Sequence, residues 1–118
     1  MAGLYVPLVL IPRFTTYAGA TTFSTVGMDV SDYDKAVLSF WRSGPASLTT
    51  FAITFEESMD QLTWSTCGGG PFNDPGAVTE TQFSPVLTKR WFRVSVTLTG
   101  SSATATCWCI GFLEQRES

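Results

Sequence analysis

Few residues of this chain could carry out acid–base or covalent chemistry. The 118-residue sequence contains no histidine, which removes the commonest general base and the commonest metal ligand. Glu56 and Glu57 are adjacent on a predicted strand, so they point to opposite faces and cannot form the carboxylate pair of a glycosidase. No serine or cysteine has an activating partner placed beside it by the sequence. We therefore predict that the protein is not an enzyme.

The three cysteines are Cys67, Cys107 and Cys109. The Cys-x-Cys pair lies on one predicted strand and points one way, so its members cannot easily bridge each other. This spacing also lacks the paired Cys-x-x-Cys pattern of zinc sites. The favoured interpretation is that all three are small buried hydrophobic residues in a reducing compartment. A disulfide from Cys67 to one of the others, leaving an odd thiol, is the alternative.

Asp29, Asp32 and Asp34 lie in or beside a predicted turn at residues 31–34. Their carboxylates could offer oxygen ligands to calcium. Turn chemistry explains the same residues without an ion, because short polar side chains hydrogen-bond their own backbone. We predict no metal and no cofactor.

The composition indicates a surface with few charges. Charged residues make up 14% of the chain, against about 25% in an average soluble domain, and Ser and Thr take their place. This favours a subunit whose surface is covered by neighbours, although a merely Thr-rich β-protein would look similar. The net charge is −3, and the basic residues are scattered. We therefore expect neither nucleic-acid nor membrane binding.

The stretch at 89–114 is the one around which the chain is organised. Residues 91–99 alternate strictly, which is typical of a half-buried strand. Residues 100–102, Gly-Ser-Ser, predict a hairpin loop. The second arm is apolar on both sides beyond Cys107, so we expect it to be covered on both faces there. The apolar side of the first arm consists of Phe92, Val94, Val96 and Leu98.

Further strands are predicted by β-branched content and by turn signals at short intervals. With the two hairpin arms and the N-terminal stretch, these give about eight strands and no helix. The fold class is therefore all-β: a single-domain, antiparallel two-sheet β-sandwich, similar to a jelly roll. The chain divides into an apolar N-terminal arm or edge strand at 1–12 and a β-sandwich domain at 13–118. The other predicted strands are residues 21–26, 35–42, 47–57, 62–67 and 78–83.

Two segments are candidate binding elements. Residues 3–12 are apolar on both sides, with Leu4, Val6, Leu8 and Leu10 on one face and Ile11 on the other, and Pro7 restricts them to a sheet edge. They form either an edge strand under their own domain or an arm on a neighbouring subunit. The glycine-rich loop at 68–76 is either a binding loop or a crossover between sheets.

Tryptophans lie on strand faces that otherwise look polar. Trp41, Trp64 and Trp91 are placed there by alternation. Exposed rings on a β-sandwich can stack on sugars, anchor a protein interface, or fill the core of the second sheet. Arg90 and Arg93 flank Trp91, which favours the interface slightly.

Two stretches resemble a known family. One is FEESMDQLTWSTC at 55–67, a strand, a Ser-x-Asp turn and a Thr-Trp strand. The other combines RWFRVSVTLTG at 90–100 with GFLEQR at 111–116. Together they resemble the small β-sandwich virion proteins of tailed bacteriophages, which include capsid decoration proteins and accessory tail domains. Their jelly-roll shape is similar to that of carbohydrate-binding modules.

The resemblance implies a structural virion protein that binds neighbouring coat proteins without catalysis. Its partners would be a major capsid or tail protein, and it would be a homo-oligomer, with a trimer as one option. It would be located in the virion, after assembly in the host cytoplasm. The alternative function is a carbohydrate-binding module, for which the partner is a glycan. No family-specific binding residue can be carried over, so the candidate partner-binding residues come from the arm, the loop and the Arg-flanked strand: Leu4, Tyr5, Val6, Leu8, Phe72, Asn73, Trp91 and Arg93.

Overall fold

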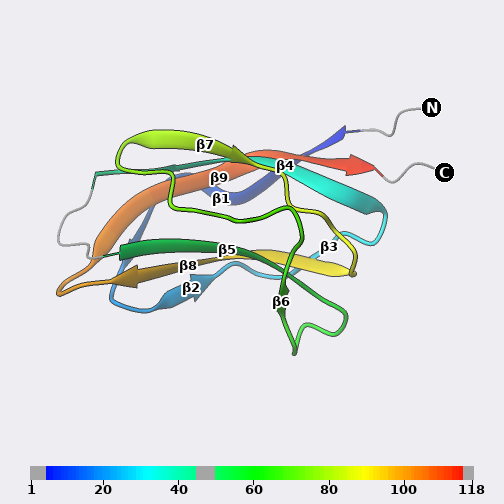
Figure 1. Ribbon diagram of the computed structural model, residues 1–118, viewed down its shortest axis with the longest axis horizontal. Coiled ribbons are helices and arrows are strands. Elements are labelled where there is room, and N and C mark those ends of the chain that lie inside the picture. The colour runs from blue at the N-terminus through cyan, green and yellow to red at the C-terminus, as the bar shows by residue number, and fades with distance from the viewer. Residues whose placement is uncertain (1–4, 45–49, 116–118) are drawn as a thin grey trace.

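The computed structural model describes residues 5–44 and 50–115, which form nine strands in two antiparallel sheets (Figure 1). The predicted all-β two-sheet sandwich is confirmed. Among these residues, no helix is long and apolar enough to span a membrane. We call the sheets A and B. Sheet A has the order β1 (Tyr5–Ala18), β9 (Thr104–Gln115), β4 (Tyr33–Arg42), β7 (Thr79–Phe83).

Sheet B lies below sheet A in Figure 1. Two short strands, β2 and β3, both pair with β8 and occupy successive parts of one edge. Counted as one interrupted strand, they leave eight strands with the first beside the last in sheet A, which is the arrangement of a jelly roll. Sheet B consists of β2 (Thr22–Ser24), β8 (Trp91–Thr99), β5 (Thr50–Ser58) and β6 (Ser65–Thr66), with β3 (Met28–Asp29) also on β8.

The core lies between the sheets and follows from period-two alternation. In β8, Phe92, Val94, Val96 and Leu98 are buried, as their alternation predicts. In β4, alternate residues from Ala36 are buried in the same way. Each fully buried large apolar side chain contributes about 1.5–3 kcal/mol relative to its exposed state.

The predicted hairpin at 89–114 is wrong. β8 pairs with β5 in sheet B, whereas β9 pairs with β1 and β4 in sheet A. Residues 100–102 therefore cross from one layer to the other, as the left end of Figure 1 shows. Turn-forming residues end a strand in either case, so they do not distinguish a hairpin from a crossover between sheets. Both strands still occupy interior positions of their sheets.

The N-terminal stretch is a long edge strand, β1, which runs continuously from Tyr5 to Ala18 and pairs with β9. The prediction that the Ile11 side chain lies on the other face of the strand from Leu8 and Leu10 is wrong. A register shift after Val9 adds one residue to β1, so that Leu8, Leu10 and Ile11 are all buried. A β-bulge of this kind interrupts the alternation on which the prediction rests.

The predicted strand at 62–67 is shorter than expected, because only Ser65 and Thr66 pair with β5. The residues before it form a turn organised by Asp60. Its Oδ1 accepts hydrogen bonds from the backbone nitrogens of Leu62 and Thr63, at 2.8 and 2.9 Å. The start predicted for the preceding strand at residue 47 lies outside the described residues, and β5 begins at Thr50.

The glycine-rich loop at 68–76 is fastened to the sandwich at two points. The Phe72 ring packs edge-on against Phe55 and Phe83, with centroids 4.9 and 6.0 Å apart. The buried guanidinium of Arg42 donates from Nε and Nη2 to the two carboxylate oxygens of Asp74, at 2.6 and 2.8 Å. A bidentate pair of this kind fixes geometry as well as adding energy.

Candidate functional site

The outer face of sheet A is apolar across three strands. Residues paired across an antiparallel ladder point to the same face. Val37 of β4 is opposite Phe112 of β9, and Ile110 of β9 is opposite Val9 of β1. Val9 is 57% exposed, and Phe14 is 66% exposed. Contiguous exposed apolar surface marks interaction sites on soluble proteins. We call this surface the apolar face: Val9, Phe14, Val37, Trp41, Trp108, Ile110 and Phe112.

An aromatic cluster lies at the centre of one row of this face. Trp41 and Trp108 stack with centroids 4.6 Å apart and rings inclined by 15°. Phe14 meets both edge-on, at 5.3 Å from Trp108 and 6.1 Å from Trp41. The Arg13 guanidinium lies 4.5 Å from the Trp108 ring centroid. Aromatic pairs in these geometries add about 0.5–1.5 kcal/mol beyond their buried area, so the three rings stabilise one another.

Phe14 reaches this cluster because of a second irregularity in β1. Between the Ile11–Cys109 and Thr15–Cys107 pairs, β1 has three intervening residues and β9 has one. Phe14 has a φ of 60°, in the left-handed region that bulky residues avoid. Such a conformation costs on the order of 1–3 kcal/mol and concentrates at functional sites. The bulge therefore places a large exposed ring on the outer face at an energetic cost.

Charges flank the aromatic row on its two sides. Arg13 is on the β1 side, and Glu80 of β7 pairs with Trp41 on the other. Within residues 5–44 and 50–115, neither forms an ion pair. Across the sheet from β1 to β7, the row therefore begins with a positive charge, continues with aromatic rings and ends with a negative charge.

The outer face of sheet B differs because it is rich in hydroxyl groups. Thr22 bonds to Thr97 and Ser24 to Ser95, each at 2.8 Å, and Thr50 bonds to Thr99. These pairs join the three strands β2, β8 and β5 at their outer side.

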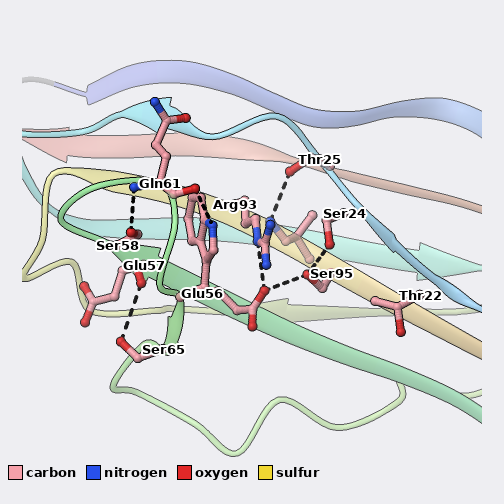
Figure 2. A network of polar contacts seen from close by, with 12 residues as sticks. Thr22, Ser24, Thr25, Glu56, Glu57, Ser58, Gln61, Ser65, Arg93 and Ser95 are labelled. Atoms are coloured by element: carbon pink, nitrogen blue, oxygen red, sulfur yellow. Dashed lines mark hydrogen bonds and ion pairs between the residues drawn. The ribbon is translucent and has the colours of Figure 1, made fainter.

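Figure 2 shows a polar network at one end of this face. Glu56 Oε1 accepts from Arg93 Nε at 2.9 Å and from Ser95 Oγ at 2.7 Å. The Trp64 ring lies over the Arg93 guanidinium, 4.1 Å from centroid to Cζ. Trp64 can lie there because residue 27 is glycine: a Cβ at Gly27 would be 3.0 Å from the indole.

Buried thiols complete the list of chemically reactive groups. Cys67, Cys107 and Cys109 are buried, and none of the three forms a disulfide. Burial raises the pKa of Cys67 and of Cys107 to about 12, and it raises the pKa of Cys109 as well. Thiols of this kind are poor nucleophiles at neutral pH.

Asp29, one of the three aspartates that could have offered oxygen ligands to calcium, takes part in a turn and an ion pair. Asp29 accepts a hydrogen bond from the Ser31 nitrogen at 3.0 Å and pairs with Arg90. The Ser31 backbone is the leading cause of the lowered pKa of Asp29. No group of three His, Cys, Asp or Glu side chains in the described part of the chain could hold a metal ion.

Comparisons with known proteins identify the fold. No protein-family model and no curated protein matches the sequence. A solved structure described as "CBM4 structure and function" matches 80% of this chain and 61% of its own, at 12% identity and a TM-score of 0.51. A structure of infectious bursal disease virus, Gx strain, matches 98% of this chain and 32% of its own, at 8% identity and a TM-score of 0.54. The chain is thus similar in fold to a carbohydrate-binding module and to part of a virus structure.

A third similar structure is the CBM22-1 xylan-binding domain from Paenibacillus barcinonensis Xyn10C. It covers 99% of this chain and 98% of its own, at 8% identity and a TM-score of 0.49. At such low identities the comparisons bear on the fold alone, and the similarity to the first two structures agrees with the β-sandwich described above.

The structure does not bring the predicted partner-binding residues together. Leu4 lies outside the described residues, and Tyr5 pairs with Glu114 at the end of sheet A. Val6 is exposed at this edge, but Leu8 is 3% exposed and packs in the core, so it offers no surface to a partner. Asn73 is exposed in the loop, whereas the Phe72 ring beside it packs against the core.

Trp91 and Arg93 point away from these residues, on the outer face of sheet B. The Arg90 guanidinium covers the half-buried Trp91 ring at 5.0 Å. Arg93 is enclosed between Trp64 and Glu56. Both side chains therefore take part in contacts within the chain.

The apolar face itself was not predicted as a site. Its signal in the sequence is the second arm beyond Cys107, where both sides are apolar. That pattern predicts cover on both faces. Within the described residues, Arg13 and Phe14 pack over Trp108, while Ile110 and Phe112 are only half-buried. The described residues thus cover the apolar outer side of β9 only in part.

Proposed function

We propose that this chain is a structural virion protein, a capsid decoration or accessory subunit that binds neighbouring coat or tail proteins without catalysis. The observation that carries the proposal is the apolar face, with the exposed Val9 and Phe14 beside the Trp41–Trp108 stack. Aromatic side chains in such clusters dominate protein–protein binding energy. The low charge content of the chain supports the same conclusion. The protein would be located in the virion after assembly in the host cytoplasm.

The fold leaves this proposal and its rival open, because the same sandwich is found in a carbohydrate-binding module and in a virus structure. The phage origin rests on the resemblance of the sequence stretches at 55–67 and at 90–100 with 111–116. Whether the chain belongs to the capsid or to the tail is decided by which protein it binds, a coat protein or a tail protein.

The test is occupancy of assembled particles. The chain is co-expressed with the coat and tail proteins encoded beside its gene, and particles are isolated by sedimentation. We expect the double variant Val9→Thr/Phe14→Asn to lose at least about tenfold in occupancy, since it removes two exposed apolar contacts. The matched control is Val26→Thr/Leu62→Asn, which alters side chains that are 85% and 86% exposed elsewhere. Equal occupancy of both variants would contradict the proposal.

A second candidate function, carbohydrate binding, is favoured by the outer face of sheet B. Its Ser and Thr pairs, with Glu56 and Arg93 beside the Trp64 ring, offer hydroxyl, charged and aromatic groups to a polyhydroxyl ligand. The discriminating measurement is tryptophan fluorescence during titration with oligosaccharides. Quenching that is lost in Trp64→Ala but kept in Val9→Thr/Phe14→Asn would favour this function over assembly.

A further inference from the structure

We propose that the apolar face is a self-association surface, on which a second copy of this chain docks face to face about a two-fold axis parallel to the strands. This inference rests on the proposed virion function and deepens it: the neighbour on the apolar face is a second copy of this chain, so that loss of the face lowers particle occupancy through loss of the dimer.

The first argument is the order of groups along the aromatic row. From β1 to β7 the row consists of Arg13 and Phe14, then Trp108, Trp41 and Glu80. A rotation about an axis that runs along the strands, between β9 and β4, reverses this order and turns the face over. Each Arg13 then lies opposite the Glu80 of the second copy, and each Trp41 lies opposite a Trp108. The face is therefore complementary to itself, as an isologous interface requires.

The second argument is that the other simple arrangement is disfavoured. A two-fold axis along the row would place Arg13 opposite Arg13 and Glu80 opposite Glu80 of the second copy. Like charges brought together at an interface are strongly unfavourable and suppress a wrong orientation. The charge pattern thus selects one of the two face-to-face arrangements.

The third argument is the state of these groups in the single chain. Neither Arg13 nor Glu80 forms an ion pair within the described residues. Other charged side chains do: Arg42 with Asp74, Arg90 with Asp29, Arg93 with Glu56. Face-to-face stacking of aligned sheets is an ordinary packing mode for β-sandwiches. The second copy supplies both the layer that the apolar residues lack and the counter-charges.

The experiment uses charge reversal and analytical ultracentrifugation of the full chain. We expect the wild type to dimerise, and we expect R13E and E80R each to raise the dimer dissociation constant at least about tenfold, since every dimer contains the contact twice. The control reversals R90E and D32R lie away from the face and leave dimerisation unchanged. Circular dichroism checks that every variant is folded.

The decisive measurement is the equimolar mixture of R13E with E80R. One variant carries two acidic groups and the other two basic groups, so the mixed dimer regains both opposite-charge contacts. We expect the mixture to dimerise about as tightly as the wild type, and the double variant R13E/E80R to do the same. A wild type that stays monomeric at every concentration, or a mixture as weak as its components, overturns the inference.

The outcomes separate this inference from the proposed function. If the wild type is monomeric but Val9→Thr/Phe14→Asn still loses particle occupancy, the face binds a different protein, and only the self-association fails. If the mixture restores the dimer but the chain is absent from particles, self-association holds and the virion function fails.

Discussion

Phe14 shows how one residue can be held in an unfavourable conformation to serve a surface. Its left-handed backbone costs energy that glycine or asparagine would avoid. In return, its ring meets Trp41 and Trp108 on the outside of the sandwich. The Trp108 Nε1 atom beneath it is buried and has no hydrogen-bond partner among the described residues, which costs about 1–3 kcal/mol. The left-handed backbone of Phe14 and the unpaired Trp108 nitrogen both lower stability, so selection for stability alone would not favour them.

Asp74 is the residue whose protonation has the clearest consequence for stability. Burial alone would raise its pKa, but hydrogen bonds from Arg42 and Gly76 and the charge of Arg42 outweigh this and lower it. A carboxyl with a lowered folded pKa stabilises the protein above its unfolded pKa of about 3.9. That contribution is lost as the pH falls through the folded pKa.

We therefore expect Asp74→Asn to destabilise the protein by about 1–3 kcal/mol at pH 7, because the buried Arg42 guanidinium loses its partner. The difference from wild type shrinks as the pH falls from about 3.9 towards the folded pKa of Asp74, because the carboxyl of the unfolded chain takes up its proton first. Urea unfolding at a series of pH values measures this. Asp32→Asn, at an exposed position, serves as the control. A difference that is the same at pH 7 and in acid would contradict the role given to the ion pair.

At the scale of elements, β9 is the strand on which sheet A depends, because it lies between β1 and β4. β9 runs close to β4 at Gly111, which pairs with Leu38. A Cβ there would be 2.0 Å from the Val37 carbonyl oxygen and 2.9 Å from the Leu38 Cα. The two backbones can run this close only because residue 111 has no side chain.

We expect Gly111→Ala to destabilise the fold by at least about 2 kcal/mol, since the added methyl group must push the two strands apart. The control is Gly44→Ala, whose Cβ would meet its nearest neighbour, Val78, at 3.8 Å. Urea unfolding followed by tryptophan fluorescence measures both. Equal stability of the two variants would show that β9 and β4 separate easily.

Much of each element could be predicted from alternation, but not how the elements combine. The buried side of β8 follows from the alternation of Phe92, Val94, Val96 and Leu98. The pairing of β8 could not be predicted, because a Gly-Ser-Ser segment permits either a hairpin or a crossover. The bulges in β1 also leave no local signal, and they decide that Ile11 points inward and Phe14 outward. The candidate site depends on the strand pairing and on the bulges in β1. The sequence therefore indicates it only through the residues beyond Cys107, which are apolar on both sides of the strand.

At the scale of the whole molecule, the accessibility of the three buried thiols measures unfolding of the sandwich. They belong to β9 and to the segment after β6, and all three face the common core. Local fraying at the sheet edges does not expose Cys107 and Cys109, because β9 is covered on both sides by neighbouring strands, whereas Cys67 follows the edge strand β6.

We therefore expect the native thiols to resist a thiol-specific reagent such as Ellman's reagent at neutral pH. The labelling rate should rise with urea in proportion to the unfolded fraction, since burial holds the pKa of Cys107 near 12. Fast labelling of Cys107 or Cys109 without denaturant would contradict this, and it would reveal an opening smaller than global unfolding.

The pairing of Tyr5 with Glu114 has a mechanical consequence. A tether pulled at these two positions would load the β1–β9 ladder from its end and open one pair of residues at a time, as a zipper opens. Antiparallel neighbours loaded in this way yield at low force, because their hydrogen bonds break in succession rather than together.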